Sequence, residues 1–388
     1  MRSQRPKSFG NHTKSLWRIL FWILALIGLA FAVSKGIKKG IESWAKIMMP
    51  VLYCFGIFLA IRALTLGAPV NPDWSALKGL EYVWNPDWSH LTWTGTLSAA
   101  GQIFFTLSLG MGLISHYASY LKPDDDIVVS SIATISLNEF AEVILAATIV
   151  IPISFAYLGE AGLTQGIGLA FVSLPNVFRD MAFGNLFGTA WFLLLFFAGF
   201  TSSLAMFSYL TTLLEEDIGV KRRYGSWCIF GCYILFGLPV ALEPILTKTD
   251  ALAYFTEVDN WIGQYLILFL GLIELLILGW FVGKKALPEI NRGGIWKLPR
   301  WFFSLLIRFV APITLSIVIV FSTLQYINQG YFNLMPEYLS ATPELIPWAL
   351  LARGVVLFVV AGGIVISYIS IKRKYGDEIR QNKVLIRK

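Results

Sequence analysis

The stretch GQIFFTLSLGMG, residues 101–112, decides how the rest of the chain is interpreted. It places a threonine, a serine and two glycines in the middle of an apolar run that covers residues 97–121. Glycine lowers helix stability by about 1 kcal/mol relative to alanine, so this pattern predicts a helix that breaks near Ser108–Gly112. Inside a membrane, a broken helix is tolerated where it lines a protected cavity, and its free backbone groups can hold ions and a carboxylate. Close helix packing at small residues is the alternative explanation.

Composition identifies the surroundings of this stretch as a membrane. Of 388 residues, 56% are hydrophobic and 14% are charged, and the mean hydropathy is +0.66. A soluble domain carries about 25% charged residues. The net charge of +7 lies in loops and not along one stripe, which argues against nucleic-acid binding.

The apolar runs predict an all-α integral membrane protein with about nine transmembrane helices, each about 20 residues long. The predicted spans are 16–33, 47–66, 97–121, 127–156, 187–214, 226–242, 261–282, 302–326 and 345–371. The first run has no small-residue cleavage pattern and is followed by three lysines, so we interpret it as a retained helix and not as a signal peptide.

Loops rich in lysine and arginine alternate with loops that contain almost none. The basic segments are 221–223, 284–300 and 372–374, and the poor loops are 67–96, 157–185, 243–260 and 328–344. The positive-inside rule therefore predicts a multi-pass protein of the cell (inner) membrane with a cytoplasmic C-terminus. An odd number of spans then puts the basic N-terminal segment outside, so either the first run does not span or the chain is the remainder of a longer protein.

This pattern predicts three parts: a basic N-terminal tail (1–15), a single transmembrane domain (16–371) and a cytoplasmic C-terminal tail (372–388).

Two further polar clusters lie inside predicted spans. Asn138, Glu139 and Glu142 share one span, and an ionisable group in such a position is usually functional. The segment AGFTSS, residues 198–203, places hydroxyl groups in the next span. Each hydroxyl could bond to a carbonyl one turn earlier in its own helix. Three oxygen-rich clusters on three helices favour a site for a hard cation, because such ions prefer oxygen ligands.

These segments resemble the bacterial neurotransmitter:sodium symporter family. The resemblance rests on residues 101–120, on LNEFAE at 137–142 and on FFAGFTSS at 196–203, with GIKKGIE at 36–42 and EINRGGI at 289–295 similar to cytoplasmic loops of the family. It aligns the chain with family helices four to twelve, and no match to the first three helices is found. It implies a leucine-transporter-type helical bundle that is truncated at its N-terminus.

The resemblance also assigns roles to individual residues. It implies that one sodium ion is bound by the side chains of Thr106 and Asn138 and a second by the Ala198 carbonyl, Thr201 and Ser202. The residues implied to line the substrate cavity are Phe105, Ser108, Met111 and Met206. Gln102 and Glu142 match the region where animal members bind chloride, and Glu142 can supply that negative charge itself.

Two acidic residues match the gates of the family. Asp259 corresponds to the acidic half of the outer gate and Glu216 to the acid of the inner gate. Their basic partners belong to family helices that have no match in this chain. Loop charge at a helix end is the alternative interpretation for both.

The resemblance implies a sodium-dependent symporter of an amino acid or amine, and not an enzyme. Sodium ions are the expected cofactors, with no organic cofactor. The expected partners are a small-molecule substrate and membrane lipid, without nucleic acid. The alternative is a non-transporting membrane fragment, or a subunit that needs a homo-oligomer or a partner supplying helices one to three. We expect the chain alone not to accumulate amino acids, since it supplies only part of each site.

Overall fold

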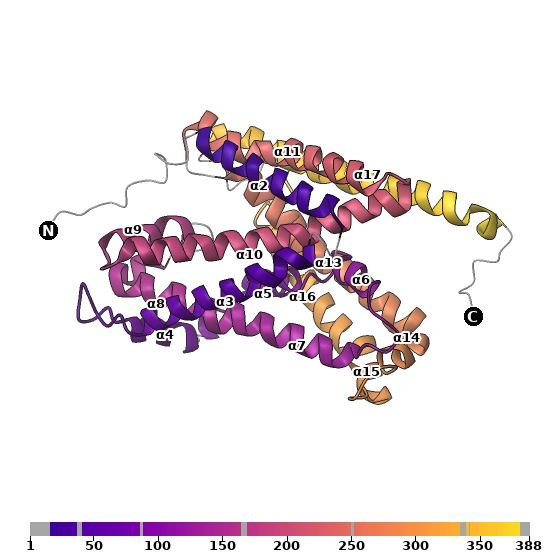
Figure 1. The fold of residues 1–388 in the computed structure, drawn as a ribbon, viewed down its shortest axis with the longest axis horizontal. Coiled ribbons are helices and arrows are strands. Elements are labelled where there is room, and N and C mark those ends of the chain that lie inside the picture. Colours follow the sequence, from indigo (N-terminus) through magenta and orange to yellow (C-terminus); the bar gives the residue numbers. More distant parts are fainter. Residues whose placement is uncertain are drawn as a thin grey trace.

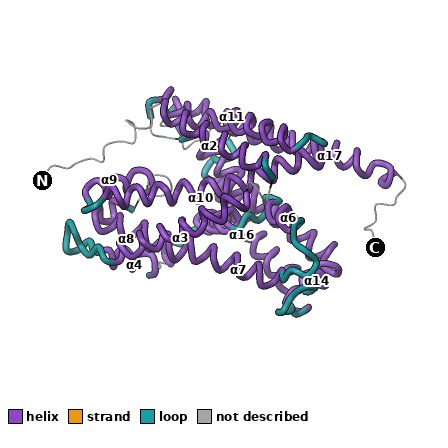
Figure 2. Tube along the Cα trace, viewed as in Figure 1, coloured by secondary structure: helices purple, strands orange, loops and turns teal. Residues whose placement is uncertain are grey.

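The structure is a computed structural model that describes residues 16–36, 41–85, 88–163, 169–249, 252–333, 339–340 and 342–380. In these ranges the chain is almost entirely helical and contains no strand (Figure 2). The predicted N-terminal tail and the last eight residues of the predicted C-terminal tail lie outside the described residues. The all-α fold class is confirmed.

The first half of the chain contains the break. Its helices are α2 (Leu16–Ser34), α3 (Glu42–Leu64), α4 (Ala76–Trp84), η2 (Trp88–His90), α5 (Trp93–Thr106), α6 (Leu113–Ala118), α7 (Ile127–Glu139), η3 (Phe140–Ala146), α8 (Ala147–Leu158), η4 (Gly159–Gly162), η5 (Leu169–Ser173) and α9 (Leu174–Asp180). Helices α7, η3 and α8 form one continuous membrane-length helix.

The second half consists mostly of long helices. They are α10 (Gly184–Leu213), η6 (Leu214–Ile218), α11 (Arg222–Thr247), α12 (Ala253–Val258), η7 (Asp259–Leu266), α13 (Ile267–Leu276), η8 (Ile277–Val282), α14 (Gly283–Ile290), α15 (Arg300–Leu305), η9 (Leu306–Val310), α16 (Ala311–Asn328), η11 (Pro343–Leu345) and α17 (Ile346–Arg380). Helix α17 continues beyond the predicted end of the last span, through Arg380.

Seven helices of the described chain are long and apolar enough to cross a membrane, and a shorter apolar helix covers Ile19–Ser34. The remaining predicted span, 97–121, is present as two short helices, α5 and α6, separated at the break. The nine predicted runs thus all correspond to helical segments. Most of the segment 243–260, which was predicted as an outer loop, is helical, because α11 extends to Thr247 and α12 begins at Ala253.

The bundle is organised around α10. This helix packs against α2, α3 and α11, and in Figure 1 it lies between the α2, α11 and α17 group and the α3, α4, α7 and α8 group. One core cluster joins α3, α8, α9 and α10 through Leu59, Ile149, Val177 and Trp191. A separate cluster joins α5, α13 and α16 through Leu97, Leu268 and Leu315. Helix α5, which precedes the break, and Met111 within the break belong to the second cluster.

Candidate functional site

The predicted break in the third apolar run is confirmed. Helix α5 ends at Thr106 and α6 begins at Leu113. Between them the backbone takes positive φ angles at Ser108 (57°), Gly110 (68°) and Gly112 (73°). Positive φ is strained for a residue with a side chain, so Ser108 is held in this conformation by its surroundings.

Both glycines at the break are also required for close packing. A Cβ atom on Gly110 would lie 2.6 Å from the carbonyl oxygen of Ile267 in α13, and one on Gly112 would overlap the Tyr209 hydroxyl of α10. Glycine is therefore needed here both for φ and for space. The packing interpretation and the break interpretation are both correct at these two positions.

The two half-helices contact different parts of the bundle. Helix α5 packs against η7, α13 and α16, whereas α6 packs against α10. In α6, the buried His116 lies with its Nε2 atom 3.5 Å from the Ser208 hydroxyl. The backbone at the break thus connects two half-helices that pack against different helices.

Polar side chains beside the break form a connected group across α5, α7 and η3. The Gln102 amide donates to Oε1 of Glu142 at 2.9 Å. The Asn138 amide lies 3.3 Å from Oγ1 of Thr106 and 3.5 Å from Oε2 of Glu142. The structure therefore brings together four residues that the sequence placed in two separate clusters.

The composition of this group fits a sodium ion. A hard cation prefers oxygen, and this group offers the Thr106 hydroxyl, the Asn138 amide oxygen and the Glu142 carboxylate. In the structure, the Asn138 nitrogen faces Thr106. A half-turn of the amide plane exchanges its nitrogen for its oxygen, and this orientation is assigned from the hydrogen-bond network. Thr106 and Asn138 would hold the ion, with Glu142 supplying negative charge beside them.

The second predicted ion site lies on α10. The Thr201 hydroxyl donates to the carbonyl oxygens of Phe197 at 2.8 Å and Ala198 at 3.1 Å. These bonds are the back-bonding alternative, and they also place the Thr201 and Ala198 oxygens side by side. Ser202 is exposed. These two adjacent oxygens, together with the exposed Ser202 hydroxyl, fit one side of the coordination shell of a cation.

The predicted substrate residues lie in the break, directly before it, or on the α10 face that meets it. Phe105 is 43% exposed, and Ser108 lies within the break itself. Met111 packs against the α5, α13 and α16 cluster. Met206 is three residues before Tyr209 on α10 and shares its helix face, which meets the break at Gly112.

Three of the predicted acidic residues lie in π-helical turns: Glu142 in η3, Glu216 in η6 and Asp259 in η7. Such turns occur frequently at functional sites, because they displace side chains from regular helical positions. The sequence analysis did not predict them, since a π-turn leaves no clear signal in hydrophobic spacing.

The two predicted gate acids have different surroundings. Asp259 accepts a hydrogen bond from Gln264 at 3.0 Å and is half-buried. Glu216 is exposed. The neighbouring Glu215, and not Glu216, pairs with Arg222, at 3.4 Å.

A polar network that the sequence pattern does not predict holds α6 to the end of α10. Arg222 donates to the Ser208 hydroxyl at 3.0 Å, to Thr212 at 3.1 Å and to the Val33 carbonyl at the end of α2 at 3.1 Å. Ser208 in turn contacts His116. The sequence signal was the arginine that begins a span, but its partners come from two other helices.

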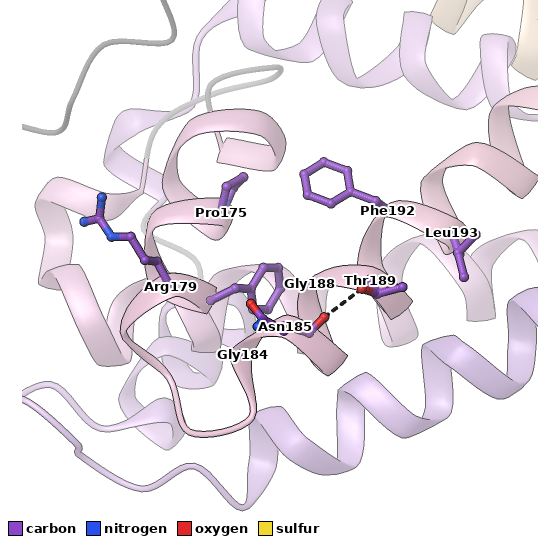
Figure 3. A pocket seen from close by; sticks show the side chains of 9 residues that line it. Pro175, Arg179, Gly184, Asn185, Gly188, Thr189, Phe192 and Leu193 are labelled. Carbon is purple, nitrogen blue, oxygen red and sulfur yellow. Dashed lines mark hydrogen bonds between the residues drawn. The ribbon is translucent and has the colours of Figure 1, made fainter. Parts of the chain in front are cut away.

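A hollow of about 530 Å³ lies between α9 and α10 (Figure 3), and its lining includes none of the predicted site residues. It is lined by Pro175, Phe178, Arg179, Gly184, Asn185, Gly188, Thr189, Phe192 and Leu193. Its lining is mainly apolar, and the Thr189 hydroxyl is already bonded to the Asn185 carbonyl. The hollow therefore offers few free polar groups for a ligand.

Known sodium-dependent transporters are similar to this chain in sequence. An uncharacterised sodium-dependent transporter of Methanocaldococcus jannaschii is 32% identical over 85% of this chain and 66% of the relative. An uncharacterised sodium-dependent transporter of Bacillus subtilis is 30% identical over 75% of this chain and 63% of the relative. The chain thus spans about two-thirds of the length of these relatives.

A solved structure shares the fold. The crystal structure of MhsT in complex with L-phenylalanine matches with a TM-score of 0.70 and 31% identity, over 81% of this chain and 70% of that chain. The model of the sodium:neurotransmitter symporter family matches residues 4–373. This chain therefore belongs to the sodium:neurotransmitter symporter family.

Proposed function

We propose that this chain is a sodium-dependent symporter of an amino acid, and that sodium and substrate bind beside the break. The observation that carries the proposal is the connected group of Gln102, Glu142, Asn138 and Thr106. An ionisable group inside a membrane span is usually functional. Here it lies beside a helix break, the arrangement that transporters use for ion and substrate sites.

The roles of individual residues follow from this arrangement. Thr106 and Asn138 would hold one sodium ion, and the Ala198 carbonyl, Thr201 and Ser202 would hold a second. Phe105, Ser108, Met111 and Met206 would line the substrate cavity, whose amino-acid preference is supported by the L-phenylalanine bound to MhsT. Asp259 and Glu216 would serve as gate acids, and the C-terminus would be cytoplasmic.

Substrate binding tests this proposal directly. The purified chain in lipid nanodiscs should bind labelled phenylalanine, or another member of an amino-acid mixture, in sodium buffer and not in potassium buffer of equal ionic strength. Ser108→Leu should abolish binding, because it fills the break, whereas the same change at the exposed Ser130 of α7 should not. Binding that is equal in sodium and potassium would contradict the proposal.

The anionic role of Glu142 has its own test. A fixed carboxylate already supplies the negative charge at this position, so substrate binding should not depend on chloride. Glu142→Ser removes that charge, and binding by this variant should then require chloride. Equal binding in chloride and gluconate by the Ser variant would show that Glu142 does not have this role.

A second candidate function is a subunit whose sites are completed by a partner chain or a second copy. The exposure of site side chains, including Phe105 at 43%, favours it. Sealed vesicles with an inward sodium gradient separate the two candidates. Uptake of labelled amino acids that collapses with the gradient identifies a symporter that is sufficient alone, whereas sodium-dependent binding without uptake identifies a subunit.

A further inference from the structure

Gln264 links the predicted outer-gate acid to the half-helix that precedes the break. Its amide nitrogen donates to Oδ2 of Asp259 at 3.0 Å, and its amide oxygen accepts a hydrogen bond from the Ser98 hydroxyl of α5 at 3.1 Å. A second contact of the same nitrogen, to Oδ1 of Asn260, is longer at 3.5 Å. One side chain thus connects η7 with α5.

The backbone around this link is shaped to permit it. A Cβ atom on Gly263 would lie 2.6 Å from Oδ1 of Asp259, so the carboxylate lies directly over this glycine. A Cβ atom on Gly101 would lie 3.1 Å from the Cα atom of Gln264. Gly101 therefore lets α5 approach η7 at Gln264 itself, and Gly263 leaves room for the Asp259 carboxylate.

The π-helical turn accounts for the direction of the Asp259 side chain. Asp259 and Gln264 are five residues apart, and both lie in η7. In a π-helix, residues five apart are aligned, as residues four apart are in an α-helix. The turn thus puts the Gln264 amide beside the carboxylate and leaves its oxygen directed at α5.

We propose that Gln264 is the positioning residue of the outer gate: it fixes the Asp259 carboxylate and couples it, through Ser98, to the position of α5. The inference deepens the proposed function, since it rests on Asp259 being a gate residue of that transporter. Movement of α5 away from η7 breaks the Ser98 bond and frees Gln264. A change at the break that moves α5 is thereby transmitted to Asp259.

A swap of hydrogen-bonding polarity tests this link more sharply than a deletion. Gln264→Glu places two carboxylates side by side and removes the donor that Asp259 uses. In the double variant Asp259→Asn with Gln264→Glu, the new amide at position 259 can donate to the new carboxylate at position 264. The other oxygen of that carboxylate still accepts from Ser98. All these variants are nearly isosteric, so packing alone does not distinguish them.

Hydrogen–deuterium exchange of the α5 amides, residues 93–106, measures the coupling without requiring sodium, substrate or transport. The full chain in nanodiscs and potassium buffer is used. We expect Gln264→Glu to raise the exchange rate by about threefold or more, because repulsion from Asp259 displaces the new carboxylate and the Ser98 bond, a single neutral hydrogen bond in the parent, is lost with it. The double swap should return it to within about twofold of the parent. Gln329→Glu, at an exposed position near the end of α16, is the control and should leave α5 exchange unchanged.

Ser98→Ala provides a second variant that leaves η7 intact. In the parent it should raise α5 exchange by about threefold, the size of one neutral hydrogen bond. In the Gln264→Glu background, where the Ser98 bond is already lost, it should have no further effect. Exchange in Gln264→Glu that equals the parent, or a double swap that stays as fast as the single variant, would overturn the inference. Failure of sodium-dependent substrate binding would leave these exchange results as they are, so the two proposals fail separately.

Discussion

The corner around α12 and the break between α5 and α6 both place polar groups inside the bundle, but in opposite ways. At the corner, the carboxylates of Glu243 and Glu257 are completely buried. Glu243 accepts from the backbone N–H groups of Ala253 at 2.6 Å and Tyr254 at 2.9 Å. Glu257 pairs with Arg353 at 2.8 Å and accepts from the Trp261 indole at 2.9 Å.

At the break, the polar groups are less enclosed and more loosely paired. Gln102 is exposed, and Asn138 and Glu142 are half-buried. The Gln102 amide reaches Glu142 at 2.9 Å, but the Asn138 amide reaches Thr106 and Glu142 only at 3.3 and 3.5 Å. A buried charge needs full compensation from the protein, whereas loosely paired oxygens can exchange their partners for a ligand. The corner is thus built for stability, whereas the looser pairing at the break suits the ion binding that we propose there.

The largest expected effect is at the corner. Arg353→Met leaves the Glu257 carboxylate buried without its cation, and breaking a buried pair in this way costs about 3–5 kcal/mol. We expect that loss in the free energy of unfolding, measured in mixed micelles with a denaturing detergent. Glu257→Gln combined with Arg353→Met should recover most of it. A single variant as stable as the parent would show that the pair does not hold α12 against α17.

Glu243 of α11 caps the start of α12, the helix that carries Glu257 near its end. Glu243→Ala leaves two backbone N–H groups at the start of α12 without their acceptor, which costs about 2 kcal/mol for buried donors. Glu243→Gln keeps one acceptor oxygen and should lose less. The same unfolding experiment measures both variants, and equal losses for alanine and glutamine would mean that the acceptor oxygen kept by glutamine does not cap the start of α12.

Gly110→Ala tests whether the break is needed for binding and not for stability of the whole bundle. A positive φ costs about 1–2 kcal/mol for a residue with a Cβ atom, and this Cβ would also press on the Ile267 carbonyl. We expect sodium-dependent substrate binding to be lost while the helical content is retained. Gly231→Ala, on α11 with open space around it, is the control. Unchanged binding in Gly110→Ala would contradict the site assignment.

The smallest effect is expected at Asp126, outside the spans, where a loop meets the start of α7. Hydrogen bonds from the backbone N–H of Val129 and then of Ile295 hold the pKa of Asp126 below its ordinary value. A lowered folded-state pKa means that this contact stabilises the protein above the ordinary pKa and is lost as the pH falls through the lowered value.

The amide resonance of Ile295 in isoleucine-labelled protein should report this loss. It should titrate at acid pH in the parent with a midpoint below the ordinary aspartate pKa. Asp126→Asn still caps α7 but has no carboxyl proton to gain, so its Ile295 resonance should not titrate there. A midpoint at or above the ordinary value in the parent would contradict the docking of this loop on Asp126.

The sequence predicted the break more fully than the corner. Glycine and serine at 108–112 were compatible with close packing or with a break, and the polar residues beside them favoured the break, so it followed from local signals. Glu243 and Glu257 lie in a segment predicted as an outer loop, 243–260. Their burial depends on α11 continuing to Thr247 and on Arg353, which is almost a hundred residues away. No local pattern predicts such a pair.

The site was predicted unevenly for the same reason. Thr106 and Asn138 lie in regular α-helices, and the resemblance had already implied that they bind the same ion. The bond between Gln264 and Asp259 depends on a π-helical turn, and the Arg222 network depends on how three helices end. Those features arise from tertiary packing, which overrides the regular helical spacing that the sequence analysis used.

The most direct test is the sodium affinity of the two proposed ion sites, the polar group beside the break and the Thr201 site on α10. Sodium-dependent thermal stabilisation of the purified chain, with potassium keeping ionic strength constant, gives an apparent affinity without transport. Asn138→Ala and Thr201→Ala each remove one oxygen ligand and should weaken this affinity by about tenfold or more, whereas Ser130→Ala, at an exposed position on α7, should not. Parent-like sodium dependence in both Asn138→Ala and Thr201→Ala would show that neither the polar group beside the break nor the Thr201 site on α10 binds sodium.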